Sequence, residues 1–387
     1  MATGSPRKAG AAVAIAILFT LPTLQSGSSL VNIAYGRSWP RSIVIDSGRQ
    51  RAYIDGISGI FPPDGFSFGV VYLGNGSIGK VLGLPGTPGE LALDASTRTV
   101  YVSGQNFVAV VDALNMTVER TITLKIPVFS MVFDNSTGDL LLTSGNKVFQ
   151  LDPASGRLLR NATVGQAAEG MAVDTAAGVV FVANYLSSSI SVLRSADLTL
   201  VKTIQIPSPA YPSKLSLDTK RGVLYATTDE QSVVRVSSTT YAVIGSITVS
   251  GSSQNGTYDV AVDPVKDRLF VATEPGTTIS EVNATTGGTL STFTVYSQAY
   301  ELVVDQATGT LYVTNYHQIT AYTPADVFRP ATSMPERGLL ALLVLVPAAL
   351  VVYALVRKFR SNGGRRGGPD PLPRTGRSWS PWSPRPP

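Results

Sequence analysis

Short runs of apolar, β-branched and aromatic residues alternate with polar turns along most of the chain, and one arrangement of these positions occurs seven times. In each copy an Asp follows an apolar residue, and an aromatic residue or Leu follows that Asp at an offset of seven. Successive copies are 40 to 48 residues apart, which fits four short strands and their turns, so each copy is predicted to be one blade of a β-propeller. The Asp positions are Asp46, Asp94, Asp134, Asp174, Asp218, Asp263 and Asp305, and the partners are Tyr53, Tyr101, Leu141, Phe181, Tyr225, Phe270 and Tyr312.

Within one copy, the segment GMAVDTAAGVVFVANY predicts a strand, a turn led by Asp and a second strand. The Asp carboxylate can accept hydrogen bonds from backbone amides of the turn. Four copies carry Gly four residues after the Asp, at Gly138, Gly178, Gly222 and Gly309, where it suits a left-handed backbone. The residue at the offset of seven is expected to face the core between neighbouring sheets. Both repeated positions are therefore predicted to be structural rather than catalytic.

The two ends of the repeated region complement each other. The seventh copy runs into ITAYTPADVF without a fourth strand, whereas LVNIAYGRSWP precedes the first Asp and is similar to fourth-strand segments such as TITLKIPVF. We predict that residues 29–36 pair with the third strand of the last blade, which leaves no open sheet edge. The predicted fold is all-β, a seven-bladed β-propeller over residues 29–325, plus one C-terminal transmembrane helix.

The N-terminus carries a targeting signal. Arg7 and Lys8 precede the apolar run AGAAVAIAILFTL, and small residues follow it. This order is typical of a secretory signal peptide, and the run is short for a membrane span. Residues 1–28 are therefore predicted to be a signal peptide, with an uncleaved N-terminal anchor as the alternative.

The C-terminus carries a membrane signal. Residues 338–356 contain no charged residue and are long enough to cross a bilayer as a helix. Basic residues follow directly, which places the tail at 357–387 in the cytoplasm, and the propeller, joined by a linker at 326–337, outside the cell. The Pro-Glu, apolar and basic order also resembles a processed sorting signal, although 27 residues follow Arg360.

The charge distribution changes the meaning of the formal net charge of +5. Between the signal peptide and the tail, 21 Lys and Arg stand against 25 Asp and Glu, a net charge of about −4. The basic character belongs to the segments that flank the membrane, so no nucleic-acid partner is expected. Cysteine is absent, which excludes disulfides, thiolate metal sites and a Cys nucleophile.

The segments AVDTAAGVVFVANY and VVDQATGTLYVTNYH resemble the YVTN-repeat, WD40-like family of seven-bladed β-propellers, which is common among archaeal surface proteins and bacterial envelope proteins. The resemblance covers roughly residues 29–325. It implies the fold strongly and the function weakly, because relatives of this architecture include surface-layer components, adhesion modules, lactonases and quinoprotein or haem-binding domains.

In a propeller, the loops that enter the first strand of each blade and leave the second lie on one face, the top. Four or five residues before the repeated Asp, this face carries Glu90, Glu169, Lys214, Tyr258, Asp259, Tyr300 and Glu301. Ten to twelve residues after it come Asn184, Tyr185, Asp229, Glu274, Asn315, Tyr316 and His317. We expect binding to involve Glu90, Lys214, Tyr258, Asp259, Tyr300, Glu301 and Tyr316.

Several other features of this face leave alternatives open. Converging carboxylates can bind Ca²⁺ or a basic partner, but no D-x-D-x-D-G loop is present, so no metal site is predicted. Phe61 and Phe66 lie on an insertion that either anchors a partner or tucks against the blade. His317 is the one histidine, and neither G-x-S-x-G, H-E-x-x-H, a P-loop nor a Rossmann fingerprint occurs. No catalytic residue and no cofactor is therefore expected.

Six of the twelve Asn residues stand in N-x-S/T sequons, more than chance predicts, which favours a glycosylated extracellular surface. These are Asn75, Asn115, Asn135, Asn161, Asn255 and Asn283. Most are predicted to lie on the bottom face, which leaves the top free.

The sequence therefore predicts a membrane-anchored cell-surface propeller that binds a surface protein or glycan as an adhesion or envelope scaffold module. The alternative is a propeller enzyme or cofactor carrier, either a lactonase-like hydrolase or a redox protein.

Overall fold

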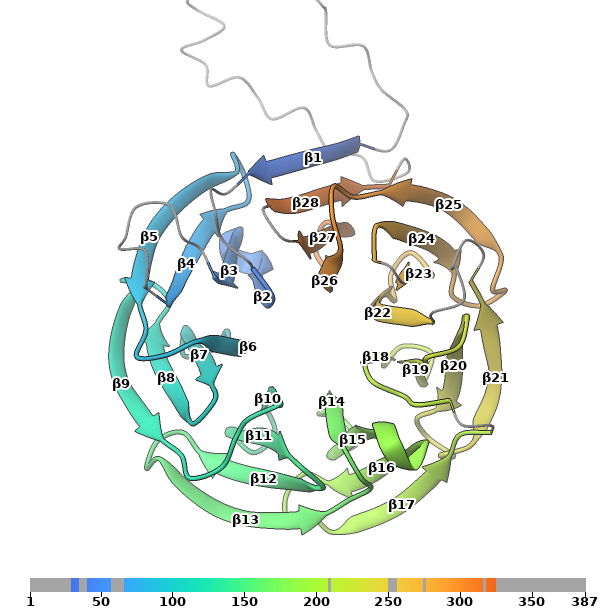
Figure 1. The fold of residues 1–387 in the computed structure, drawn as a ribbon, viewed down its shortest axis with the longest axis horizontal. Coiled ribbons are helices and arrows are strands. Elements are labelled where there is room, and N and C mark those ends of the chain that lie inside the picture. The colour runs from blue at the N-terminus through green and yellow to red at the C-terminus, as the bar shows by residue number, and fades with distance from the viewer. Residues whose placement is uncertain are drawn as a thin grey trace, which may run out of the picture. The chain divides into compact units, whose positions relative to one another are not determined.

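The computed structural model describes residues 29–34, 40–56, 66–207, 210–249, 256–273, 276–315 and 318–324. These residues form seven four-stranded antiparallel sheets arranged as a ring around a central axis (Figure 1). The predicted all-β, seven-bladed propeller is confirmed. The predicted signal peptide, linker, membrane helix and tail lie outside the described residues. Within the described ranges, no helix is both long enough and apolar enough to cross a membrane.

Each of the first four blades is one consecutive run of four strands. Blade 1 consists of β2 (Ile43–Asp46), β3 (Arg51–Asp55), β4 (Ser67–Tyr72) and β5 (Ser77–Gly83). Blade 2 consists of β6 (Pro88–Asp94), β7 (Thr99–Gly104), β8 (Phe107–Asp112) and β9 (Thr117–Thr123). Blade 3 consists of β10 (Ser130–Asp134), β11 (Asp139–Ser144), β12 (Lys147–Asp152) and β13 (Arg157–Thr163). Blade 4 consists of β14 (Ala168–Asp174), β15 (Val179–Asn184), β16 (Ser189–Arg194) and β17 (Leu200–Gln205).

The remaining blades include the one that closes the ring. Blade 5 consists of β18 (Leu215–Asp218), β19 (Val223–Thr227), β20 (Ser232–Ser237) and β21 (Val243–Thr248). Blade 6 consists of β22 (Thr257–Asp263), β23 (Arg268–Thr273), β24 (Thr278–Asn283) and β25 (Thr289–Thr294). Blade 7 consists of β26 (Ala299–Asp305), β27 (Thr310–Asn315), β28 (Gln318–Thr323) and β1 (Ser29–Ala34). Two short 3-10 helices, η1 (Ser47–Arg49) and η2 (Tyr185–Ser187), follow strands in blades 1 and 4.

Strand β1 closes the ring by acting as the outer strand of blade 7. It pairs antiparallel with β28, from Ser29 opposite Thr323 to Ala34 opposite Gln318. The predicted closure is confirmed. The inner strands of neighbouring blades are in contact all the way round, including β2 with β26. Residues from the two ends of the repeated region therefore share one sheet.

The repeated Asp residues hold the first turn of every blade. Each is buried, and the Oδ1 atom of each accepts a hydrogen bond from a backbone N–H two or three residues later. In blade 7, for example, Ala307 N donates to Asp305 Oδ1 over 3.0 Å. The turn then passes through a residue with positive φ, such as Gly178 at 65°. Blades without Gly at this position adopt the same backbone, with φ of 52° at Gln50 and 64° at Arg98.

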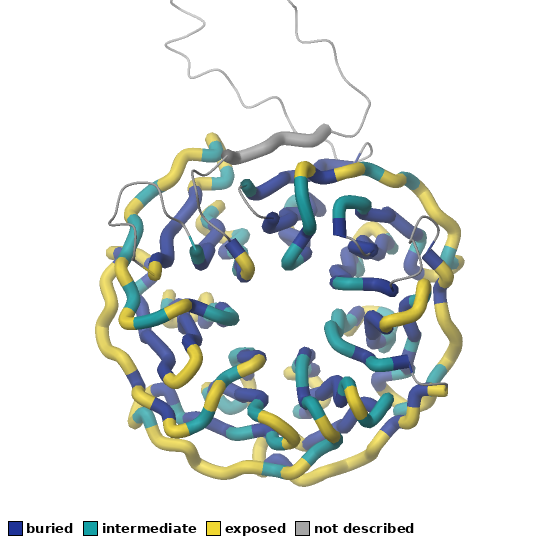
Figure 2. The backbone as a smooth tube through the Cα atoms, viewed as in Figure 1, coloured by how far each residue is buried: buried dark blue, intermediate teal, exposed yellow. Residues whose placement is uncertain are grey.

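The hydrophobic core lies between adjacent sheets rather than at the centre of the ring. It consists of seven separate clusters, and each contains one residue of the repeated aromatic or Leu position. Two tyrosines at this position also connect neighbouring blades, because Tyr53 Oη donates to Ala113 O over 3.1 Å and Tyr225 Oη donates to Ala284 O over 3.2 Å. Burial decreases from the second and third strands to the outer rim (Figure 2). This packing leaves the axis free for polar side chains.

Candidate functional site at the propeller axis

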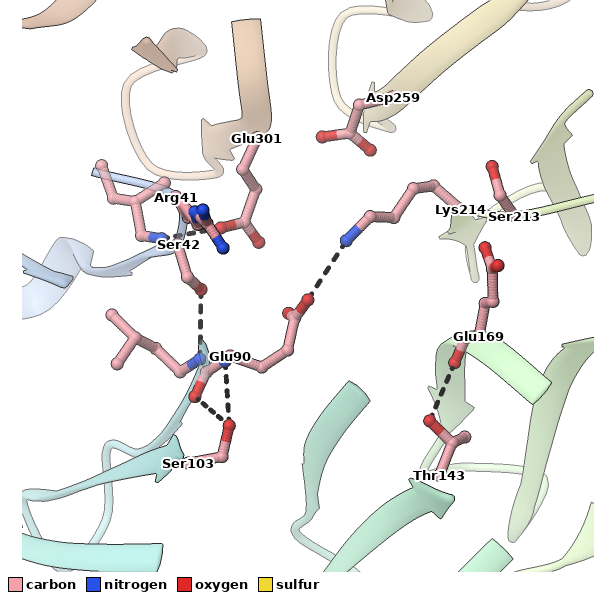
Figure 3. A network of polar contacts seen from close by, with 12 residues as sticks. Arg41, Ser42, Glu90, Ser103, Thr143, Glu169, Ser213, Lys214, Asp259 and Glu301 are labelled. Carbon is pink, nitrogen blue, oxygen red and sulfur yellow. Dashed lines mark hydrogen bonds and ion pairs between the residues drawn. The ribbon is translucent and has the colours of Figure 1, made fainter. Parts of the chain in front are cut away.

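One position of the repeat, four residues before the turn Asp, lies toward the axis of the ring. We call it the axial position; its members are Ser42, Glu90, Ser130, Gly170, Lys214, Asp259 and Glu301. Six of these seven residues, all except Ser42, line one cavity of about 300 Å³, which we call the axial cavity. The four charged members come from blades 2, 5, 6 and 7 (Figure 3). The predicted candidates Glu90, Lys214, Asp259 and Glu301 are therefore brought together.

Bulges near the start of four inner strands lie beside the axial residues Glu90, Gly170, Asp259 and Glu301. The register with the second strand shifts between Pro88 and Leu91 in β6, and equivalent shifts occur in β14, β22 and β26. A bulge adds one residue to one strand and re-aims the side chains beside it. Backbone N–H groups at the bulges donate to side-chain hydroxyl groups of the neighbouring strand. Glu90 N donates to Ser103 Oγ over 2.9 Å, and Glu301 N donates to Thr314 Oγ1 over 3.1 Å.

Glu90 and Lys214 form an ion pair across the axis. Lys214 Nζ lies 3.3 Å from Glu90 Oε1, and the two side chains come from β6 and from the residue that precedes β18, on opposite sides of the ring (Figure 3). Lys214 is 34% exposed and Glu90 is 24% exposed, and both line the axial cavity. The charge of Glu90, together with those of Asp259 and Glu301, raises the pKa of Lys214 despite the opposing effect of burial. The ammonium group therefore stays protonated.

Asp259 and Glu301 connect neighbouring blades. Asp259 Oδ2 accepts a hydrogen bond from Leu302 N in the next blade over 2.6 Å, and its Oδ1 accepts one from Val260 N over 2.8 Å. Glu301 Oε2 accepts one from Ile43 N of blade 1 over 2.7 Å. Ser42 continues this pattern, because its Oγ accepts a hydrogen bond from Leu91 N over 3.1 Å. These axial side chains join the blades, whereas Glu90 reaches across the ring.

Burial raises the pKa of both carboxyl groups that connect neighbouring blades, Asp259 and Glu301. It raises the pKa of Asp259 to about 6, although Lys214 and two backbone N–H groups oppose the rise. Burial and the charge of Glu90 raise the pKa of Glu301 well above its ordinary value, against the effect of Lys214. Four carboxyl groups, including Glu169, therefore lie near one ammonium group, and the axis has a deficit of positive charge.

Asp55 is a buried acidic residue near this site that the sequence analysis did not select. Its Oδ1 accepts hydrogen bonds from Arg41 N and Ser42 N, both over 2.7 Å. Burial raises its pKa to about 7, with the two backbone donors opposing and the charge of Glu90 adding to the rise. Asp55 occupies the ninth position after the turn Asp, where the other blades carry Ser, Thr or Ala. Asp55 is the one charged residue at this position of the repeat, and this exception was the signal in the sequence that could have identified it.

A second cavity of about 520 Å³ adjoins the axial cavity, and we call it the lateral pocket. It shares Glu90, Ser130, Gly170 and Lys214 with the axial cavity and extends between blades 3 and 4. The absence of a side chain at Gly170 is required here, because an added Cβ would lie 2.4 Å from Ser213 O. The remaining lining residues are Phe129, Gly145, Ala167, Ala168 and Glu169.

The other predicted site residues have different placements. Tyr258 packs against the core cluster between blades 6 and 7, and Tyr300 is half-buried on β26; neither lines the axial cavity or the lateral pocket. Asn184 is fully buried, and its side chain accepts a hydrogen bond from Gly165 N over 3.0 Å. The remaining candidates on this part of the face, Glu274, Tyr316 and His317, lie outside the described residues, as does Phe61.

The donor groups at the axis suit non-covalent recognition. Over the parts of the chain that the structure describes, no group of three or more His, Cys, Asp or Glu residues is arranged to hold a metal ion. The charged groups that line the axial cavity can offer polar or ionic contacts. The chain matches no known protein-family model and shows no significant similarity to any curated protein.

Proposed function

We propose that this protein is a binding module that uses the top face of its propeller, around the axial cavity, to hold another component of the cell surface. The observation that carries the proposal is the convergence of Glu90, Lys214, Asp259 and Glu301 in one cavity from four separate blades. A repeat position that carries charge in only some blades makes the site asymmetric. Such asymmetry supports selective recognition by charge complementarity.

The proposed setting is the cell surface, with the propeller outside and the tail inside. Residues 1–28 and 338–356 support it by their sequence patterns. Asn75, Asn115, Asn135 and Asn161 are exposed, which is compatible with glycosylation.

Protease treatment of intact cells should then release propeller fragments and leave the tail protected. A propeller degraded only after cell lysis would contradict this orientation. The repeat pattern further supports membership of the YVTN-repeat family, whose surface proteins provide the analogy.

Binding is favoured over catalysis by the state of the charged groups. A protonated Lys214 cannot act as a nucleophile or general base. Both oxygens of Asp259 already accept backbone hydrogen bonds. The alternative, a lactonase-like hydrolase or a redox propeller, predicts lactone turnover or a visible absorption band. We expect the purified propeller to have neither.

The binding function is tested by capture from a native cell-surface fraction. Glu90→Gln together with Lys214→Gln removes both partners of the axial ion pair and keeps the formal net charge. We expect this double variant to retain its melting temperature within a few degrees and to capture at least about tenfold less of the bound component.

The chain offers a matched control on the opposite face. Arg194 Nη1 lies 3.1 Å from Asp197 Oδ2 in an exposed ion pair near the turn between β16 and β17. Arg194→Gln together with Asp197→Asn removes this pair with the same change in charge, and capture should be unchanged. If the axial and the control variants capture equally well, the axial cavity is not the binding site.

A further inference from the structure

The lateral pocket has an apolar floor held in place by backbone hydrogen bonds. Phe129 N donates to Thr143 O over 3.0 Å, and Ala168 N donates to Gly145 O over 2.8 Å, which fixes the pocket wall on the blade 3 side. Gly170 N donates to Ser213 O of blade 5 over 2.9 Å on the other side. The floor between them consists of Ala167 and Ala168. A cavity of about 520 Å³ with such a lining is in the size range of small-ligand or side-chain sites.

One carboxylate in this pocket lacks a cation of its own. Among the described residues, Glu169 forms no ion pair, while the ammonium group of Lys214 is paired with Glu90. Burial and the charge of Asp229 raise the pKa of Glu169, and Lys214 offsets this only in part. The pocket therefore combines an apolar surface with one uncompensated negative charge, which is complementary to a cation on an apolar stem.

Two exposed apolar side chains belong to the pocket lining or to the segment hydrogen-bonded to it. Phe129 is 57% exposed and Leu186 is 59% exposed. Leu186 lies beside the pocket because Leu186 N donates to Gln166 O over 3.2 Å, and Tyr185 N donates to Ala167 O over 2.9 Å. The ring of Tyr185 is 5.3 Å from that of Tyr211, measured between centroids. Aromatic and apolar groups around a polar pocket are typical of contact surfaces for proteins rather than of sites for small free amines.

We propose that the lateral pocket binds a Lys or Arg side chain of a partner protein. The side-chain stem lies on Phe129, Ala167 and Ala168, the charged head pairs with Glu169, and apolar residues that flank the basic residue contact Leu186 and the Tyr185 ring. This inference rests on the proposed binding function and names the chemistry of the partner.

A defined peptide tests the inference without knowledge of the partner. The probe is a fluorescein-labelled Gly-Leu-Lys-Leu-Gly peptide, measured by fluorescence anisotropy against the purified propeller. Acetylation of the Lys amine removes its charge and should weaken binding at least about tenfold. Replacement of both Leu residues by Ser should also weaken it. Glu169→Gln should weaken binding of the Lys peptide about tenfold and leave binding of the acetylated peptide unchanged. Only the Lys peptide carries an ammonium group that can pair with Glu169.

Two further protein variants complete the experiment. Phe129→Ser removes an exposed ring and should weaken both the Lys peptide and the acetylated peptide. Glu119→Gln changes the same charge on the exposed outer strand β9 and should affect neither. Circular dichroism and melting curves establish that every variant is folded.

Specific outcomes would overturn the inference. The first is equal binding of the Lys peptide and the acetylated peptide, and the second is an unchanged affinity of the Glu169→Gln variant for the Lys peptide. The third is displacement of the Lys peptide by hexylamine at equal concentration, which would indicate a site for small free amines. Failure of the peptide experiment with retained, axis-dependent capture from the cell-surface fraction would overturn this inference alone. Loss of that capture dependence would overturn the proposed function as well.

Discussion

At the scale of single residues, the first turn of every blade combines the repeated Asp with a left-handed backbone position that different residue types occupy. The fourth residue after the turn Asp has positive φ in all seven blades, although only four of them carry Gly there. A left-handed backbone costs a residue with a Cβ roughly 1–2 kcal/mol, which Gly avoids. Local strain is therefore distributed unequally among the blades.

A pair of reciprocal substitutions measures this strain. Gly178→Ala should lower the free energy of unfolding by about 1 kcal/mol, and backbone strain alone is responsible because an added Cβ would meet no atom within 4 Å. Arg98 is exposed with φ of 64°, so Arg98→Gly should raise the free energy of unfolding by up to about 1 kcal/mol. Urea unfolding followed by far-UV circular dichroism gives both values. Changes of the same sign would show that the turn backbone is not the cause.

The sequence located the axial residues correctly but did not distinguish their roles. The spacing from the turn Asp was enough to place Glu90, Lys214, Asp259 and Glu301 on one face. It could not show that Asp259 and Glu301 accept backbone hydrogen bonds from the next blade, since those contacts join residues 43 and 258 positions apart. Asp55 was missed because its donors, Arg41 and Ser42, lie on a separate segment before β2.

At the scale of secondary-structure elements, β1 is the part of the ring that sequence order does not supply. The other six blades are each formed by consecutive strands, but blade 7 takes its outer strand from the opposite end of the repeated region. Without β1, one side of β28 would have unpaired backbone groups. The stability of the whole ring therefore depends on a strand of six residues.

Proline substitutions in β1 test this dependence. Successive amides of a strand point to opposite sides, so one of the N–H groups of Asn32 and Ile33 must face β28. The double variant Asn32→Pro and Ile33→Pro should lower the free energy of unfolding by roughly 2–4 kcal/mol and promote aggregation through the open edge. The matched control, Asn32→Ala and Ile33→Ala, keeps both N–H groups. Calorimetry and light scattering give the result, and equal behaviour of the two variants would mean that pairing by β1 does not close the ring.

At the scale of the whole molecule, closure of the ring places several carboxyl groups in one poorly solvated region. Each blade by itself would leave its axial side chain in water. Closure of the ring buries Asp55 and Asp259, and this burial raises the pKa of Asp55 to about 7 and of Asp259 to about 6. Raised pKa values in a folded protein make its stability depend on pH.

The direction of this dependence follows from proton binding. Unfolded Asp has a pKa of about 3.9, so between about pH 4 and pH 7 the folded state binds more protons than the unfolded state. The stabilisation is complete below about pH 4 and is lost as the pH rises through the folded-state values. These groups alone should therefore make the propeller less stable at pH 8 than at pH 5, by roughly 1.4 kcal/mol for Asp259.

Melting temperatures across this range measure the effect. Asp55→Asn cannot ionise and keeps the one oxygen that accepts both backbone hydrogen bonds. Asp259→Asn cannot ionise either, but it keeps only one of the two acceptor oxygens. Each should reduce the difference between pH 5 and pH 8, and Asp55→Asn should raise the melting temperature at pH 8. Glu119→Gln, on the exposed rim, should change neither. A propeller that gains stability from pH 5 to pH 8 would contradict this account of the axis.

The sequence by itself determined the repeat, its number of blades and the turn chemistry, because these follow from local spacing. It also indicated the closure, because the two ends of the repeated region complement each other. A fixed offset between an Asp and an aromatic residue or Leu defines one turn and the following strand within about ten residues. Seven copies of that unit have few ways to bury the apolar faces of their sheets. Only the tertiary structure decided which axial side chains meet. Glu90 and Lys214 are 124 positions apart, and their contact depends on ring curvature and on bulges that re-aim the inner strands. The lateral pocket likewise is lined by residues of several blades, and Gly170 allows the backbone of the next blade to lie close, which no local pattern encodes.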